Sequence, residues 1–198
     1  MRGWKPTETP SFKVLGDNLF LVEFVNDRDK KRVLEGRPWV FEENLFGVEE
    51  YDGLTSPANF TFDKVSFWVR MFNLPLGCMS LVVGQQIGSS LGQVEEVDVD
   101  EGSMGWGAFL RVKVTIDLHK PLVRRRMLKI NGSSTLVGFQ YERLPKFCCR
   151  CGVLKHGMTS CSANTSSRKQ NAPVEYKARL RGPSPKRVFG GKLGHKAD

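Results

Sequence analysis

The chain has 198 residues, 40% of them hydrophobic, and a formal net charge of +9 at pH 7. These values are typical of a soluble protein with one substantial core and small appendages. No run of about eighteen apolar residues is present, which excludes a membrane-spanning helix. Residues 1–6 lack the apolar segment of a secretory signal.

The N-terminal part predicts a polar terminus followed by a hairpin. Residues 1–10 are mostly polar and contain two prolines, so we expect them to lack fixed structure, although Trp4 is a large group that favours packing. Residues 11–53 predict a partial first α/β half. It begins with two apolar runs, 12–15 and 18–25, around turn-forming residues, and this pattern is typical of a β-hairpin.

A helix and a further strand complete this first half. Asn26 or Asp27 is suited to cap the helix at its N-terminus, and Gly36 is suited to end it. Residues 39–48 then predict one further strand, with Glu42 and Glu43 at its turn. The expected order is strand, strand, helix, strand.

Residues 54–63 are a polar linker, and residues 64–145 predict a second, α+β half. Alternating apolar residues predict strands, and a segment of mixed helical spacing before Gly92 predicts a helix. The strands are expected at 65–71, 93–99, 106–118, 123–130 and 134–144, and the helix at 79–91. The Asn131-Gly132 pair between the last two strands is a strong hairpin signal. Glycines 84, 88 and 92, spaced by four, predict close packing of the helix.

Three consecutive arginines, Arg124, Arg125 and Arg126, lie in the strand expected at 123–130. Side chains alternate across a strand, so at least one arginine must point away from its neighbours. A solvated edge that deters pairing with another sheet is the favoured interpretation. Contact with nucleic acid is the second interpretation.

Residues 146–162 contain the ligand pattern C-x2-C-x4-H-x4-C of a zinc knuckle. Cys148, Cys151, His156 and Cys161 fit it without gaps, whereas Cys149 is left over. Two thiolates separated by two residues can bind one ion from a tight turn, and an imidazole and a third thiolate complete the tetrahedron. A loop this short has no core of its own, so we expect Zn²⁺ to organise it. A cysteine cluster with a redox role, or with no role, is the alternative.

Zinc knuckles of this spacing resemble those of retroviral nucleocapsid and retrotransposon proteins, which bind single-stranded nucleic acid. In such knuckles apolar side chains beside the ligands form a platform for a base. Cys149 and Gly157 occupy those positions here, with Phe147 and Met158 one step outside. The residues predicted to contact nucleic acid are Lys146, Phe147, Arg150, Lys155, Met158, Arg168 and Lys169. The alternative is a knuckle that only stabilises the fold and does not bind nucleic acid.

The positive charge is concentrated at the C-terminal end. Residues 1–140 carry 17 Lys and Arg against 18 Asp and Glu. Residues 141–161 carry four basic and one acidic side chain, and residues 162–198 carry nine basic and two acidic. A positive field at one end suits binding to phosphates. Residues 163–198 have few large apolar groups, so we expect a disordered basic tail. The predicted fold class is α+β, a mainly antiparallel sheet with two helices, followed by a small zinc knuckle and this tail.

Three segments, 36–41 (GRPWVF), 67–76 (FWVRMFNLPL) and 141–148 (YERLPKFC), resemble the plant family known as domain of unknown function 4283 joined to a CCHC knuckle. The resemblance implies a gag-like protein of plant LINE-type retrotransposons, or a host copy of one. Members of that family begin with a further strand and helix, so this chain resembles an N-terminally truncated member. Residues 175–181 resemble a short element that follows the knuckle in the family, with Lys177 and Arg179 in place of glycine and tryptophan.

No catalytic constellation accompanies these motifs, and we expect a protein that is not an enzyme. His119 is expected at an exposed strand end, and the acidic residues Asp98, Asp100 and Glu101 are expected in a solvated loop. The clustered cysteines, with Cys78 alone, suit a reducing compartment, which predicts the nucleus or cytoplasm. The leading hypothesis is low-specificity binding of single-stranded RNA or DNA. The second is self-association into a homo-oligomer. No membrane and no small-molecule substrate are expected.

Overall fold

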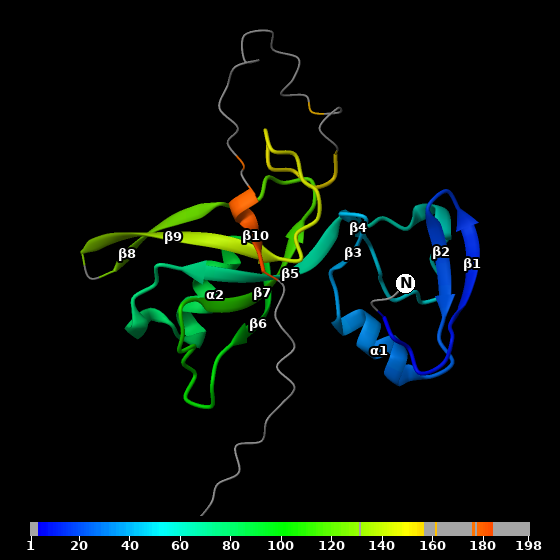
Figure 1. Ribbon diagram of the computed structural model, residues 1–198, viewed down its shortest axis with the longest axis horizontal. Helices are drawn as coiled ribbons and strands as arrows, with labels where there is room; N and C mark the ends of the chain where they lie inside the picture. Colours follow the sequence, from blue (N-terminus) through cyan, green and yellow to red (C-terminus); the bar gives the residue numbers. More distant parts are fainter. Residues whose placement is uncertain (1–3, 131, 157–160, 162–175, 177, 184–198) are drawn as a thin grey trace, which may run out of the picture.

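The computed structural model describes residues 4–130, 132–156, 161, 176 and 178–183. Its elements form two small hairpins and one larger antiparallel sheet, which lie side by side in Figure 1. The strands are β1 (Ser11–Gly16), β2 (Leu19–Glu23), β3 (Trp39–Phe41), β4 (Asn44–Phe46), β5 (Lys64–Phe72), β6 (Gln93–Asp98), β7 (Leu110–Asp117), β8 (Arg125–Ile130), β9 (Ser133–Glu142) and β10 (Arg181–Gly182). The helices are α1 (Asp27–Glu35) and α2 (Leu81–Ser89), with short 3-10 turns at Pro57–Asn59, Leu76–Cys78 and Ala178–Leu180. The predicted α+β class is confirmed. Neither described helix is long and apolar enough to cross a bilayer.

Residues 4–10 are packed rather than free, which corrects the expectation for this part of residues 1–10; residues 1–3 lie outside the described residues. Trp4 is 5% exposed and its ring lies within about 6 Å of four aromatic rings, those of Phe12, Phe24, Trp39 and Phe46. The buried carboxylate of Asp29 accepts hydrogen bonds from the Thr7 and Glu8 backbone N–H groups at 2.7 and 3.4 Å. Burial of the indole and these backbone hydrogen bonds fix residues 4–10.

Helix α1 forms where its caps predict. The Asn26 side chain accepts from the Asp29 N–H, and the Gly36 N–H donates to the Arg32 carbonyl. The strand expected at 39–48, in contrast, is two strands, β3 and β4. Glu42 and Glu43 both have positive φ, +47° and +64°, which is the conformation of a tight two-residue hairpin turn. Sequence alone favoured one strand because glutamate rarely occupies such a turn.

The larger sheet has the order β10-β9-β5-β7-β6, with β8 also paired to β9. Helix α2 packs on one face, where added Cβ atoms on Gly84 and Gly88 would lie 2.7 Å from Val97 and Val94. The three glycines spaced by four therefore allow close packing, as predicted. The core lies between this helix and alternating residues of the central strands, which are Phe67, Val69, Met71, Leu110, Val112, Val114, Val137, Phe139 and Tyr141.

Part of the expected disordered tail is ordered. Tyr176 and Leu180 are buried, and β10 pairs in parallel with the end of β9, Arg181 opposite Tyr141. These residues bury apolar surface that composition averaged over the tail did not reveal. The rest of 163–198 lies outside the described residues.

Candidate metal centre

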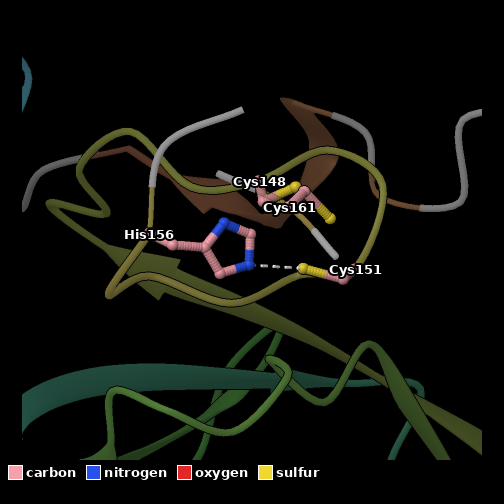
Figure 2. Close-up of side chains that lie close together, drawn as sticks. All are labelled: Cys148, Cys151, His156 and Cys161. Atoms are coloured by element: carbon pink, nitrogen blue, oxygen red, sulfur yellow. Dashed lines mark hydrogen bonds between the residues drawn. The ribbon is translucent and has the colours of Figure 1, made fainter. Parts of the chain in front are cut away.

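Four side chains from one loop after β9 converge in the structure. The Sγ atoms of Cys148, Cys151 and Cys161 and a ring nitrogen of His156 all lie within 4.8 Å of one another. Figure 2 shows the imidazole pointing at the sulfur of Cys151, with Nε2 and Sγ 3.0 Å apart. In the described residues these are the one group of three or more side chains suited to hold a metal ion. They are the four residues that the spacing predicts.

This donor set fits zinc. Bonds of about 2.3 Å to sulfur and about 2.0 Å to nitrogen place neighbouring ligand atoms of a tetrahedron roughly 3.5 to 3.8 Å apart. The observed separations, from 3.0 Å up to at most 4.8 Å, bracket that range, so small shifts bring all four atoms onto one ion. Three thiolates and one imidazole are typical of a structural zinc site with no open position. A site of this kind stabilises the fold of the loop that contains its ligands.

Backbone N–H groups favour the thiolate form of one ligand, Cys148, which is the form that binds a metal ion. Burial raises the pKa of Cys148, but the backbone N–H groups of Cys151 and Arg150 donate to its sulfur, and the net effect lowers its pKa to about 7. Burial and the neighbouring Cys148 and Cys161 sulfurs raise the pKa of Cys151. Three thiolates packed together need a positive charge among them, and a divalent metal ion supplies it.

The turn that contains the first two ligands, Cys148 and Cys151, ends at Gly152 and depends on it. Its φ is +77°, a conformation that side chains disfavour, and its N–H donates to the Cys148 carbonyl at 2.7 Å. The Cys148 N–H in turn donates to the Val153 carbonyl at 3.0 Å. An added Cβ on Gly152 would clash with the ring of Tyr176, which lies against this turn. The missing side chain thus serves both the backbone conformation and the close approach of the ring.

The loop is docked on the second half of the chain. Leu122 N–H donates to the Gly152 carbonyl at 2.9 Å, and Lys155 N–H donates to the Leu118 carbonyl at 3.1 Å. The ammonium of Lys155 also lies 3.0 Å from the carboxylate of Asp63. The expectation that metal alone organises an isolated loop is therefore incomplete, because the strand ends around Leu118 and Leu122 help to position it.

The pairing of Asp63 has an electrostatic signature. Hydrogen bonds from His119 and Lys155 lower the pKa of the Asp63 carboxyl well below its usual range. A carboxylate whose pKa is lowered on folding stabilises the folded state at pH values above its ordinary pKa. This stabilisation is lost as pH falls through the lowered pKa. The loop that contains the four ligands Cys148, Cys151, His156 and Cys161 is called the metal loop below. The ion pair that joins it to Asp63 of the linker is therefore formed at neutral pH. His119 is exposed at a strand end, as predicted.

The residues predicted to contact nucleic acid lie in different environments in the structure. Phe147 is 9% exposed and belongs to the core, with the Arg181 guanidinium 5.9 Å from its ring centroid. The ring is therefore covered by the chain itself, which disfavours it as a stacking platform for a base. Lys146 lies on the surface, 3.1 Å from Glu43, and Arg150 is exposed on the loop. Lys155 is the residue paired with Asp63. Met158, Arg168 and Lys169 lie outside the described residues.

Sequence reasoning missed the packing of Tyr176 against the site. Tyr176 N–H donates to the Cys149 carbonyl at 3.1 Å, and its ring lies 4.8 Å below the guanidinium of Arg124. Two features of the sequence could have indicated this contact. Tyr176 is the one aromatic residue between the last cysteine and Phe189, and Gly152 leaves space beside the ligands.

Comparison with known proteins agrees with this description. The zinc knuckle family matches residues 116–163, and the family described as domain of unknown function DUF4283 matches residues 1–59. A relative from Arabidopsis thaliana, named "Uncharacterized protein At4g02000", is 26% identical over 137 residues. The alignment covers 67% of this chain and 42% of that protein. No solved structure matches. The N-terminal part of the chain is therefore similar to DUF4283, and the part with the four converging ligands is similar to the zinc knuckle family, whose match begins well before the first cysteine.

Proposed function

We propose that this is a zinc-dependent, non-catalytic protein that binds single-stranded RNA or DNA with little sequence preference. The observation that supports it most is the convergence of three cysteines and one histidine in a segment that matches the zinc knuckle family. Zinc knuckles are recurrent modules of single-strand recognition. The resemblance to gag-like retrotransposon proteins suggests the same partner, with action in the nucleus or cytoplasm.

The charge distribution favours contact through phosphates. Residues 141–198 contain 13 of the 30 Lys and Arg of the chain but three of its 21 Asp and Glu. Lys146 forms an exposed ion pair with Glu43, whereas Lys155 forms one with Asp63 and also donates a hydrogen bond to the Phe62 carbonyl at 3.2 Å. Exposed ion pairs are worth roughly 0 to 1 kcal/mol, so a phosphate can replace the Glu43 carboxylate beside Lys146 at little cost. Because the Phe147 ring is buried, phosphate contacts rather than base stacking on that ring would dominate, and low sequence preference follows.

The test is titration of labelled single-stranded oligonucleotides with the zinc-loaded full chain at several salt concentrations. We expect the logarithm of affinity to fall linearly with the logarithm of salt, by roughly 0.7 per phosphate contacted. We also expect similar affinities for strands of different sequence. An affinity independent of salt, or one unchanged in His156→Ala, would contradict the proposal.

Self-association is the second candidate, and one observation favours it. Every residue of β1 is exposed, although the strand contains Phe12, Val14 and Leu15. A two-stranded hairpin with apolar residues on its surface is marginally stable by itself, and a second copy of the chain would cover them. In this alternative the metal loop only stabilises the fold.

Light scattering distinguishes the two candidates. Self-association predicts a dimer or larger species of the full chain, converted to monomer by Val14→Asp without loss of zinc. A wild-type chain that is monomeric and still binds single strands would exclude self-association and support the nucleic-acid proposal.

A further inference from the structure

The β8–β9 hairpin extends beyond the rest of the larger sheet. Residues 138–141 of β9 pair with β5, whereas residues 133–138 pair with β8, so in the part of the chain that the structure describes no third strand lies beside the far half of the hairpin. Figure 1 shows it projecting past α2 and the neighbouring strands. The far half of the hairpin is therefore a two-stranded extension of the sheet, with an inner face toward α2 and an outer face.

The three consecutive arginines are divided between these surfaces. Arg126 Nη2 donates to the Ser90 carbonyl at 3.4 Å, at the C-terminal end of α2, where a helix favours positive charge. Arg124 lies over the ring of Tyr176. These two arginines have structural partners on the inner side. Arg125 points to the opposite surface, because side chains alternate along a strand.

The opposite surface combines cations and exposed apolar groups. We define the hairpin outer face as Phe72, Arg125, Met127, Lys129, Leu136 and Gly138. Met127 and Leu136 are cross-strand neighbours, 59% and 39% exposed, and Arg125 is opposite Gly138, which is in turn opposite Phe72. Arg125 and Lys129 are exposed and have no ion-pair partner among the described residues.

Gly138 leaves a gap in this face. An added Cβ would meet nothing within 4 Å, so the strand is bare between the Arg125 side chain and the Phe72 ring. Phe72 is half-buried, with its ring centroid 5.4 Å from that of Phe109, and it lies across Gly138 from Arg125. Aromatic rings and arginine side chains are the groups on which nucleobases stack. Lys129 stands two pleats away from Arg125, about 13 Å along the strand, so a bound strand would meet a cation at each end of the apolar pair.

The charge of the segment favours an anionic occupant. Between Asp117 and Glu142 the chain has five basic residues, namely Lys120, Arg124, Arg125, Arg126 and Lys129, and no Asp or Glu. The base of the same hairpin contacts the metal loop through the hydrogen bond from Leu122 to Gly152. A polyanion held at the metal loop is thus adjacent to the hairpin.

We propose that the hairpin outer face is a second contact surface for single-stranded nucleic acid, with Arg125 and Lys129 binding phosphates and Phe72, Met127 and the bare strand at Gly138 receiving bases. This surface extends the proposed function and rests on it. It also reverses the sequence-based preference, because the arginine triplet is not uniformly a solvated edge.

The first test compares two double variants of the full, zinc-loaded chain. Arg125→Ala with Lys129→Ala removes two outer-face cations, and Arg28→Ala with Lys31→Ala removes two exposed cations from α1 as a charge-matched control. We expect the salt slope for a labelled single strand to fall by about 1.4 in the hairpin variant, since each lost phosphate contact contributes roughly 0.7. The α1 variant should keep the wild-type slope.

The second test fills the gap. Gly138 has an ordinary strand conformation, so Gly138→Val should fold at least as stably as wild type, because β-branched residues favour strands. We expect its affinity for single strands to fall severalfold while its melting temperature is unchanged or higher. Unchanged affinity would show that no base occupies the gap.

The outcomes separate this inference from the proposed function. If wild type binds single strands but the hairpin variant matches the α1 control, the hairpin surface is wrong and the proposed function stands. If wild type binds none, both fail. Binding of anionic phospholipid vesicles, in place of oligonucleotide and lost in the hairpin variant, would overturn the inference in favour of a membrane surface.

Discussion

Gly152 is the residue on which the shape of the metal loop depends most directly. We predict that Gly152→Ala weakens zinc binding, because alanine at positive φ costs roughly 1 to 2 kcal/mol and its Cβ would displace the Tyr176 ring. Gly53→Ala is the matched control, since Gly53 also has φ of +77° but open space around it. Competition with a chromogenic chelator measures the zinc affinity. Equal effects of both substitutions would show that contact with Tyr176 is unimportant.

The five neighbouring metal-loop side chains divide into four ligands and one bystander. We predict that His156→Ala and Cys148→Ser retain less than one zinc per chain after dialysis, because a tetrahedral site with three ligands binds more weakly. Cys149→Ser should retain one equivalent, because the Cys149 sulfur is not in the converging group. Elemental analysis of purified protein provides the measurement. Full zinc content in His156→Ala would exclude histidine as a ligand.

For single residues, the sequence predicted the metal ligands better than it predicted the tertiary contacts of each side chain. Ligand spacing is local, so it is visible in fourteen residues. Whether Phe147 is a platform or a core residue depends on Arg181 and on the sheet beneath, which are distant in sequence. The packing of Trp4 likewise depends on four rings contributed by four other segments. Contacts of this kind follow from tertiary structure and have no local pattern.

Among the elements, the C-terminal segment formed by Tyr176 and residues 178–183 has an unexpected structural role. Leu180 is buried in the core. We predict that Leu180→Ala lowers the free energy of unfolding by about 2 to 5 kcal/mol, the usual range for a buried leucine. Leu54→Ala, at a site 89% exposed, should change it by about 0.5 kcal/mol or less. Urea unfolding of zinc-loaded protein measures both, and similar values would contradict the packing of this segment.

Elements with local signals were predictable and the others were not. The Asn131-Gly132 turn predicted the β8–β9 hairpin, and Asn26 with Gly36 predicted α1. The turn at Glu42 and Glu43 was not recognised as a hairpin because those residues seldom adopt positive φ. Strand β10 is two residues long and held by parallel pairing with β9, which no alternation of side chains can indicate.

In the whole molecule the metal loop, the C-terminal segment and the larger sheet contact one another through main-chain hydrogen bonds. Zinc should therefore stabilise more than its own loop. We predict that addition of zinc raises the midpoint of thermal unfolding and slows amide exchange at Leu122, whose N–H is bonded to Gly152. Exchange at Val69, in the sheet centre, serves as the reference. Exchange at Leu122 that is insensitive to zinc would contradict this coupling.

We propose that the zinc-ordered loop enables the cationic end of the chain to bind single strands. Its most direct test is the affinity of one protein sample for labelled single-stranded RNA when zinc-loaded, when stripped by chelator, and after zinc is restored, all at one salt concentration. We predict that affinity falls about tenfold or more, ~1.4 kcal/mol, when zinc is stripped, and recovers when zinc is restored. Equal affinity in all three states would contradict it.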